Sequence, residues 1–303
     1  MQTVGLIGVG IMGTPMVRTL LRGGFRVNIY DQVQDHVQPL VKEGAVGLES
    51  PKAVARASDV VITMLPNSKI VEAVMFGGSG LYEGLEKGKI YIDMSSSDYA
   101  SNQRISSKLA EKEVPMLDAP VTGSVKGAEE GTLTIMVGGE AQVLEQARPV
   151  LEALGSKIIH VGPIGTADIA KACNQMLFAM NTAAAAEVLA LSAKAGLDPE
   201  MLMSIVNTGS GESYAGRVKM ANFTFKRNFK PGFTTNLMAK DVDIALNMAR
   251  ELQVPMRLGT LVRENLRTAQ NRGYGLNDCS VVACLEEEDA GVVIQPFRDR
   301  EDA

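Results

Sequence analysis

The amino-acid sequence predicts an α/β domain built around a doubly wound parallel sheet, followed by an all-helical domain. Up to about residue 162, short runs rich in β-branched residues alternate with helical patterns, as in successive βαβ units. After that point only helical patterns follow, and no run predicts a strand. We therefore expect residues 1–162 to form the first domain and residues 163–303 the second.

Length and composition agree with two globular domains. The chain has 303 residues, and about 150 residues per domain is typical. Apolar residues make up 46% and charged residues 21%, which excludes a disordered chain and a coiled coil. The net charge is -5 and aromatic residues make up only 5%, so we expect neither nucleic acid nor an anionic membrane as a partner.

The cysteines and the N-terminal residues predict a cytoplasmic protein. Cys173, Cys279 and Cys284 are an odd number at unrelated spacing, which fits no disulfide framework. Only two histidines are present, so we expect no metal site. The first residues show no signal-peptide pattern, and no run approaches about 18 consecutive apolar residues.

The expected strands of the first domain alternate with helices. Continuous apolar runs, such as the one at residues 60–62, suit strands that are covered on both faces. The expected strands are 4–7, 26–30, 60–64, 89–93, 115–119, 132–137 and 157–161, and the helices between them include 16–22 and 101–112. The expected helices of the second domain are 167–194, 199–206, 241–250 and 258–272.

The first expected strand leads into a glycine motif, Gly8-Val9-Gly10-Ile11-Met12-Gly13, directly before a helical pattern. In such a motif, Gly8 allows a tight turn, Gly10 lets the backbone approach a pyrophosphate, and Gly13 lets the helix pack on the strand. The N–H groups and the dipole of the helix N-terminus then face the phosphates. Asp31 follows the second strand 18 residues beyond Gly13, close to the usual spacing of about 20. These features predict a Rossmann-type domain whose turn binds a dinucleotide.

Asp31 also predicts which dinucleotide is bound. A carboxylate at this position can accept hydrogen bonds from the ribose hydroxyls of NAD, and it repels the 2′-phosphate of NADP. Residues 32–34 are Gln, Val and Gln, so they supply no cation to offset the repulsion. We therefore expect NAD, with NADP less favoured. A helix-capping role for Asp31 is the alternative, and it does not exclude cofactor binding.

Two further segments carry polar groups suited to a small carboxylate. Residues 118–124 read Asp-Ala-Pro-Val-Thr-Gly-Ser, and such a glycine-containing strand exit can offer N–H and hydroxyl groups to an anion. Lys171, Asn174 and Gln175 are spaced to share one face of the long predicted helix. Lys171 stands among small and apolar residues, which argues against simple solvent exposure. A plain loop and a solvated lysine remain the alternatives.

On these motifs the chain resembles the β-hydroxyacid dehydrogenases, which include tartronate semialdehyde reductase and 3-hydroxyisobutyrate dehydrogenase. The resemblance covers about residues 2–285 and implies a 6-phosphogluconate-dehydrogenase-like fold. The glycine turn resembles the family's cofactor fingerprint, and residues 93–96, Asp-Met-Ser-Ser, are similar to its cofactor-side segment. Lys240-Asp241 resembles the family's late lysine motif near the cofactor. Beyond the turn and Asp31, the resemblance implies cofactor contacts from Leu65, Pro66, Ser96, Phe233 and Lys240.

The resemblance also implies the reaction and the residues that carry it. Lys171 falls on the family's catalytic lysine and acts as general acid and base while hydride passes between a 3-hydroxy acid and the nicotinamide. Thr122, Gly123 and Ser124 hold the substrate carboxylate, with Thr122 for the usual Ser and Ser124 for a usual Gly. Asn174 and Gln175 orient the substrate, and Gln175 stands where many members have a second Asn.

The substrate and the assembly stay open within this resemblance. Tartronate semialdehyde with glycerate, or 3-hydroxyisobutyrate, is the favoured substrate type, and threonate, serine, 3-hydroxypropionate or a sulfonated analogue are alternatives. An imine reductase typically carries Asp or Tyr where Lys171 stands, and a non-catalytic cofactor-binding scaffold would not need the lysine. Four alanines at 183–186 let a second helix approach closely, and the resemblance implies a homodimer or homotetramer.

Overall fold

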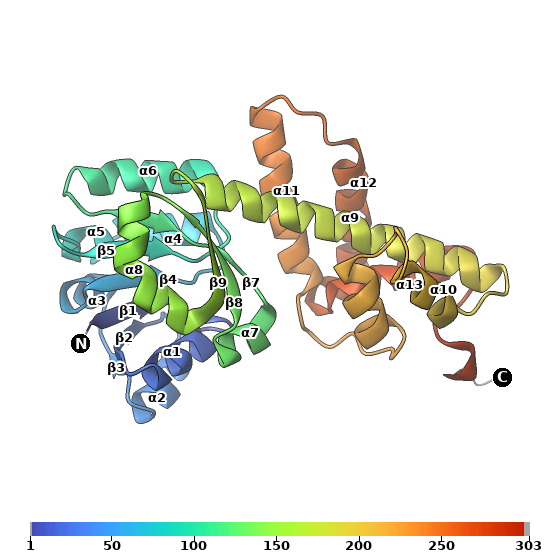
Figure 1. Cartoon of the computed structure of the whole chain (residues 1–303), viewed down its shortest axis with the longest axis horizontal. Helices are drawn as coiled ribbons and strands as arrows, with labels where there is room; N and C mark the ends of the chain where they lie inside the picture. Colours follow the sequence, from blue (N-terminus) through green and yellow to red (C-terminus); the bar gives the residue numbers. More distant parts are fainter. Residues whose placement is uncertain (1, 300–303) are drawn as a thin grey trace. The chain divides into compact units, whose positions relative to one another are not determined.

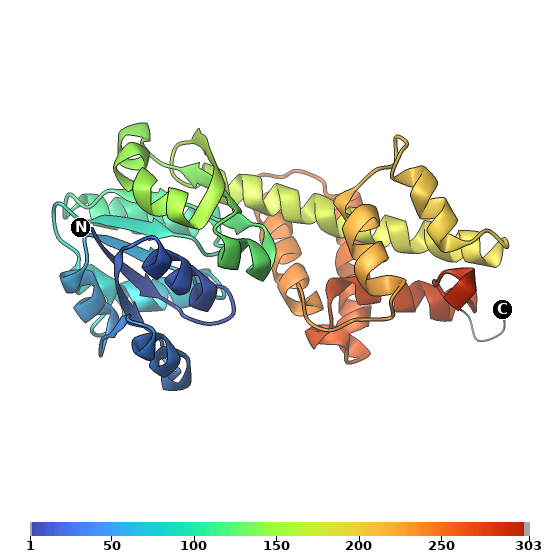
Figure 2. The same ribbon diagram turned by 60° about the horizontal axis from the view of Figure 1, so that its bottom comes forward.

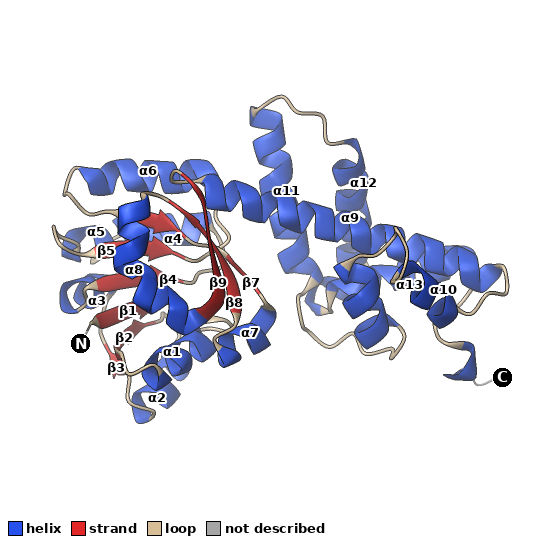
Figure 3. Ribbon diagram, viewed as in Figure 1, coloured by secondary structure: helices blue, strands red, loops and turns tan. Residues whose placement is uncertain are grey.

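The computed structural model describes residues 2–299, which divide between Lys171 and Ala172 into an α/β unit and a helical unit. The division lies inside α9 (Thr166–Lys194), the longest helix of the described chain (Figure 1). Figure 3 shows that the strands belong to the first unit. Each unit is described by itself.

The α/β unit contains a nine-stranded sheet in the order β3-β2-β1-β4-β5-β6-β8-β7, with β9 paired to β8. The pairs from β3 to β6 are parallel. Strand β8 is antiparallel to β6 and β7, so the expected parallel arrangement applies only to part of the sheet. The strands are β1 (Thr3–Ile7), β2 (Arg26–Tyr30), β3 (Val46–Gly47), β4 (Val60–Thr63), β5 (Ile90–Asp93), β6 (Met116–Asp118), β7 (Val121–Thr122), β8 (Leu133–Gly138) and β9 (Gly155–Gly162).

Helices cover both faces of this sheet. Successive residues of a strand point to opposite faces, so a strand of consecutive apolar residues presents an apolar surface on each side. Leu6 of β1 packs into a cluster with residues of α1 and α8, whereas its neighbour Ile7 packs into a second cluster with residues of α3 to α6. Two apolar layers result, and Figure 2 shows the unit from a second side. The helices are α1 (Gly13–Arg22), α2 (Gln34–Lys42), α3 (Pro51–Ala57), α4 (Ser68–Phe76), α5 (Leu81–Gly84), α6 (Tyr99–Ala110), α7 (Ser124–Glu130) and α8 (Ala141–Leu154).

The segment after β6 differs from the plain loop that was one interpretation of its sequence. It contains the two-residue strand β7 and the helix α7, which ends at Gly131 in the left-handed conformation with φ 68°. Both elements are too short to show a hydrophobic period, so sequence patterns do not reveal them. Strand β7 places residues 121 and 122 beside β8.

The helical unit packs its helices around a core dominated by alanine and methionine, including Ala179, Ala186 and Met238. By length and composition alone, α9 contains a stretch that is apolar enough to cross a membrane. However, 56% of this stretch is buried within the chain, which is typical of a core helix. One element of the unit, η1, is a π-helix, which a 3.6-residue pattern does not predict. Besides α9, the elements are α10 (Pro199–Val206), η1 (Ala215–Thr224), α11 (Thr235–Glu251), α12 (Arg257–Asn271), η2 (Tyr274–Leu276), η3 (Cys279–Val282), α13 (Ala283–Ala290) and η4 (Phe297–Asp299).

Candidate active site

The glycine turn between β1 and α1 has two glycines that the fold requires and one that borders open space. A Cβ atom on Gly8, which has φ 91°, would lie 2.3 Å from the carbonyl oxygen of Met64. A Cβ atom on Gly13 would lie 1.9 Å from the carbonyl oxygen of Gly8. On Gly10 it would meet no heavy atom of the described residues within 4 Å. The turn is therefore tight on its protein side and open at Gly10.

The N-terminus of α1 is suited to an anion. Its N-cap residue, Met12, makes no side-chain capping hydrogen bond, and the described first turn contains no acidic residue. The positive end of the helix dipole is therefore not offset by a carboxylate of that turn. Ile11, at the tip of the turn, is 78% exposed. With the space beside Gly10, these features fit the pyrophosphate of a dinucleotide.

Asp31 lies beside this turn in a defined orientation. Its Oδ2 accepts a hydrogen bond from the Val9 N–H at 2.8 Å, and its Oδ1 accepts one from the Val33 N–H at 2.8 Å. The Nδ1 atom of His36 lies 3.6 Å from Oδ1, a neighbour that the sequence interpretation did not consider. The carboxylate is half-buried and its backbone partners hold it next to the glycine turn.

The other predicted cofactor residues of the α/β unit follow neighbouring parallel strands. Leu65 and Pro66 come after β4, and the Leu65 N–H donates to the Ser95 hydroxyl at 2.9 Å. Ser96 comes after β5 and is half-buried. Since β1, β4 and β5 are parallel neighbours, their carboxyl ends share one edge of the sheet. In open α/β sheets this edge is where ligands bind.

Lys171 contacts the predicted substrate segment within the same unit. Its side chain is only 8% exposed, and its Nζ donates a hydrogen bond to the Val121 carbonyl oxygen at 2.8 Å. The next three residues, Thr122 to Ser124, are exposed. Gly123 has φ 138° and Ser124 has φ 63°, so the chain turns sharply there. A buried lysine side chain thus contacts the residue that directly precedes an exposed segment, which can offer N–H and hydroxyl groups.

The first turn of α9 is held by a buried carboxylate. Asp118, the last residue of β6, accepts hydrogen bonds from the N–H groups of Gly165 at 2.8 Å, Ala167 at 3.0 Å and Asp168 at 3.1 Å. Burial raises the pKa of Asp118, whereas these backbone donors act to lower it. The sequence interpretation placed Asp118 in the substrate segment and did not foresee that it caps α9.

Two further buried residues join this network. The Asn102 amide donates to Asp168 Oδ2 at 2.8 Å and to Asp93 Oδ2 at 3.2 Å. Burial raises the pKa of Asp168 well above its ordinary value, and the Asp118 and Asp93 carboxylates raise it further. The sequence offered a weak signal for Asp168, which precedes Lys171 by three residues on one helix face, and none for Asn102.

In the helical unit, the predicted residues Gln175 and Lys240 meet at one buried carboxylate. Gln175 donates to Asp241 Oδ2 at 2.8 Å, and Lys240 Nζ lies 3.0 Å from Asp241 Oδ1. Asn174 is exposed and donates to Gln175 Oε1 at 3.2 Å. Asp241 thereby orients the Gln175 amide. Phe233 belongs to this unit as well, and its ring lies with its centroid 6.3 Å from that of Phe178 at a tilt of 41°.

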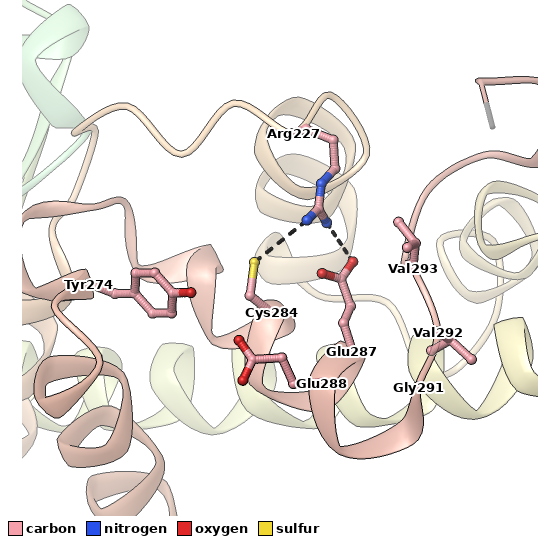
Figure 4. Close-up of a pocket in the computed structure, with 8 residues that line it drawn as sticks. All are labelled: Arg227, Tyr274, Cys284, Glu287, Glu288, Gly291, Val292 and Val293. Carbon is pink, nitrogen blue, oxygen red and sulfur yellow. Dashed lines mark hydrogen bonds and ion pairs between the residues drawn. The ribbon is translucent and has the colours of Figure 1, made fainter. Parts of the chain in front are cut away.

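A pocket of about 450 Å³ in the helical unit contains none of the predicted residues (Figure 4). Arg227 donates hydrogen bonds there to Glu287 and to the Cys284 sulfur. Burial raises the pKa of Cys284 to about 11, so its thiol is protonated and a poor nucleophile at neutral pH. The pocket is lined by Arg227, Tyr274, Cys284, Glu287, Glu288, Gly291, Val292 and Val293.

The sheet order and the glycine turn define the class of the protein, a dinucleotide-binding protein with a Rossmann-type domain. A family model described as the NAD binding domain of 6-phosphogluconate dehydrogenase matches residues 3–162. A second, described as NAD-binding of NADP-dependent 3-hydroxyisobutyrate dehydrogenase, matches residues 165–285.

Individual relatives extend over nearly the whole chain. A 2-(hydroxymethyl)glutarate dehydrogenase of Eubacterium barkeri is 39% identical, over 96% of this chain and 97% of the relative. An NAD-dependent L-serine dehydrogenase of Pseudomonas aeruginosa is 37% identical, over 96% of this chain and 100% of the relative. The structure of Mycobacterium tuberculosis 3-hydroxyisobutyrate dehydrogenase with L-serine has a TM-score of 0.89 at 30% identity, covering 94% of this chain and 99% of that one.

The chain belongs to the β-hydroxyacid dehydrogenase family. It is an NAD-dependent 3-hydroxyacid dehydrogenase, and the predicted family, fold class and cofactor are confirmed. Imine reductase structures share the fold at 16–20% identity.

Proposed function

We propose that the protein interconverts a small 3-hydroxy carboxylic acid and its semialdehyde or keto form, with Lys171 as general acid and base. The observation that carries this proposal is the buried Lys171 side chain, whose Nζ lies 2.8 Å from the Val121 carbonyl oxygen, next to the exposed residues 122–124. Bound NAD supplies the hydride acceptor, and NADH the hydride donor.

The residues around Lys171 bind and orient the substrate in this proposal. Thr122, Gly123 and Ser124 hold the substrate carboxylate through N–H and hydroxyl groups, which donate charge-assisted hydrogen bonds to an anion. Asn174 and Gln175 orient the reacting carbon. Lys171 donates a proton to the carbonyl oxygen during reduction and accepts the hydroxyl proton during oxidation.

The cofactor is held mainly by the first domain, residues 1–162, in this proposal. The glycine turn, residues 8–13, holds the pyrophosphate and Asp31 accepts hydrogen bonds from a ribose. The further contacts come from Leu65, Pro66 and Ser96, and from Phe233 and Lys240 of the second domain, residues 163–303. The second domain also provides the oligomer contacts.

The relatives' names narrow the substrate class. Serine, 3-hydroxyisobutyrate and 2-(hydroxymethyl)glutarate all carry a hydroxymethyl group on the carbon next to a carboxylate, and they differ in the second substituent of that carbon. Glycerate shares the same arrangement. The common part supplies the oxidised hydroxyl and the bound carboxylate, so we expect the substrate to contain it.

The test is a comparison of hydroxy acids that, apart from threonate with its substituted C3, differ only in the substituent on this carbon. Oxidation of glycerate, 3-hydroxyisobutyrate, serine, 2-(hydroxymethyl)glutarate, threonate and 3-hydroxypropionate would be followed by NADH absorbance, and NADH oxidation would be followed with tartronate semialdehyde. We expect turnover with at least one hydroxymethyl acid and none with its carboxamide. Tight NADH binding without turnover across the panel would contradict the proposal and favour a scaffold.

We also propose a cytoplasmic homodimer or homotetramer assembled through the helical unit. Leu177, Val188 and Leu191 of α9 are 58%, 45% and 69% exposed, and their spacing puts them on one helix face. A second copy would cover this apolar stripe. Sedimentation velocity at micromolar concentration should give a dimer or larger, and Leu191→Asp should weaken it; a wild-type monomer would contradict the assembly.

A further inference from the structure

The N-terminus of α9 is occupied by a side chain from a distant part of the chain. Both carboxylate oxygens of Asp118 accept backbone N–H groups there: Oδ1 accepts from Gly165 and Oδ2 accepts from Ala167 and Asp168. Asp118 lies 47 to 50 residues before these donors. An anion at a helix N-terminus is stabilised by the dipole and by the unpaired N–H groups. The carboxylate therefore ties the end of β6 to the start of α9.

The same short segment contacts α9 a second time. Three residues after Asp118, the Val121 carbonyl oxygen accepts the hydrogen bond from Lys171 Nζ at 2.8 Å. Asp118 thus contacts the first turn of α9, and Val121 contacts a side chain of its second turn. Two contact points on one rigid helix determine both its axial position and its rotation relative to the segment. The segment continues directly into Thr122, Gly123 and Ser124.

We propose that Asp118 is a positioning residue, which sets the place of the Lys171 ammonium relative to residues 122–124. This inference rests on the proposed function, in which those residues hold the substrate carboxylate. Asp118 does not relay protons itself, because both of its oxygens are engaged by backbone N–H groups. It acts through Lys171, since a misplacement of about 1 Å can cost about 100-fold in rate.

The test is a double-mutant cycle of Asp118→Asn and Lys171→Met in the full-length enzyme. Asp118→Asn keeps the shape but replaces one acceptor oxygen by a donor group, which faces backbone N–H donors. We expect kcat to fall about 10- to 100-fold, with the NADH dissociation constant, measured by fluorescence, within about twofold of wild type. In the Lys171→Met background, Asp118→Asn should reduce the residual kcat by less than about twofold, because effects through one group are not additive.

Asp168→Asn is the matched control. It makes the same chemical change in the same buried network but leaves the Asp168 N–H, which Asp118 accepts, in place. We expect its kcat to stay within about twofold of wild type. Equal losses of kcat in Asp168→Asn and Asp118→Asn would show a general effect of the network and overturn the inference.

A second variant covers the case in which Asp118→Asn does not fold. A Cβ atom on Gly138 would lie 2.3 Å from Asp118 Oδ1, so Gly138→Ala should displace the carboxylate without changing its charge. A folded Gly138→Ala enzyme should also lose kcat when Lys171 is present and lose little in the Lys171→Met background. An unchanged kcat would overturn the inference, and so would the same fold loss of kcat with and without Lys171. Retained activity in Lys171→Met alone would instead contradict the proposed function, so the two failures are distinguishable.

Discussion

Two places in the α/β unit bring a helix N-terminus to the end of a strand, and they differ in what caps that helix. At the first, β1 runs through the glycine turn directly into α1. At the second, β6 ends at Asp118, which meets the start of α9 only after the chain has passed through β7, β8 and β9. In both places a helix N-terminus lies at the end of a strand. At α1 the N-cap side chain makes no capping hydrogen bond, whereas at α9 a distant carboxylate of the protein caps the helix.

This difference indicates which of the two helix N-termini is available to an anionic ligand. A helix N-terminus favours negative charge wherever it lies. At α1 no acidic residue of the described first turn uses this preference, and in our proposal it serves the cofactor phosphates in the space beside Gly10. At α9 the preference is already satisfied by Asp118, so the helix that carries Lys171 is positioned before any ligand binds. Substitutions at both junctions test this contrast.

The largest effect should follow Lys171→Met, at the second junction. This change keeps most of the side-chain length and removes the proton carrier, so kcat should fall about 10²–10⁴-fold, roughly 3–5 kcal/mol of transition-state stabilisation. NADH binding, measured by fluorescence, should change little because the glycine turn is untouched. Lys171→Arg keeps the charge but does not release its proton near neutral pH, and it should fail almost as badly. More than about a tenth of wild-type kcat in Lys171→Met would make the lysine merely structural.

The glycines of the first junction should separate folding from binding. Gly13→Ala places a Cβ atom 1.9 Å from the Gly8 carbonyl oxygen, so the free energy of unfolding in urea should fall by about 3 kcal/mol. Gly10→Ala meets no described atom within 4 Å, so stability should change by less than about 0.5 kcal/mol. Its NADH dissociation constant should rise about tenfold, or 1.4 kcal/mol, because the methyl group fills the phosphate space. Equal stability losses in the two variants would refute the contrast between the two glycines.

Asp31→Arg should change cofactor preference at the first junction. The carboxylate's hydrogen bonds to a ribose are lost and an arginine can instead pair with the 2′-phosphate, which together shift the preference by about 1.5–3 kcal/mol. The ratio of kcat/KM for NAD over NADP should therefore fall about 10- to 100-fold. Asp31→Asn, which removes the charge and keeps an acceptor, should give an intermediate ratio. If wild type used both cofactors equally, the role assigned to Asp31 would be wrong.

The smallest effect should be a change in the pH dependence of stability in Asp168→Asn. Burial raises the folded-state pKa of Asp168. At a pH between the unfolded-state and the folded-state pKa, the native protein therefore keeps a proton on this carboxyl group that the unfolded chain has released. The stabilising contribution is complete below the unfolded pKa of about 3.9 and is lost as pH rises through the raised folded pKa. The amide of the Asp168→Asn variant does not ionise, so the variant does not lose stability in this way as pH rises. In wild type, the Asp168 Oδ1 atom is buried without a hydrogen-bond partner among the described residues.

We therefore expect Asp168→Asn to be more stable than wild type at pH 7.5 by about 1–3 kcal/mol, the usual cost of an unsatisfied buried polar group. The gain should shrink toward pH 4.5 in urea unfolding. A gain that does not depend on pH would show that protonation of Asp168 is not its cause.

Much of the fold was predictable because its signals are local. The glycine turn follows a strand and precedes a helix, and the structure has β1 and α1 at those positions. The seven expected strands are all present, with ends that differ by up to two residues. Strands β3 and β7 were missed because two residues carry no period. The antiparallel pairing of β8 was missed because strand direction depends on the path of the chain, which residue patterns do not record.

The sequence by itself predicted the kind of cofactor, since a glycine turn and an acidic residue after the second strand are patterns of neighbouring residues. It indicated the kind of chemistry through the resemblance of Lys171 and its neighbouring amides to the family's motif. Only the tertiary structure decided how Lys171 is held. Asp118 reaches α9 across 47 residues, Asn102 joins Asp168 to Asp93, and Asp241 orients Gln175 from 66 residues away. Local patterns reflect backbone hydrogen bonding and helix or strand period, whereas these contacts exist only after loops have closed and distant elements have packed.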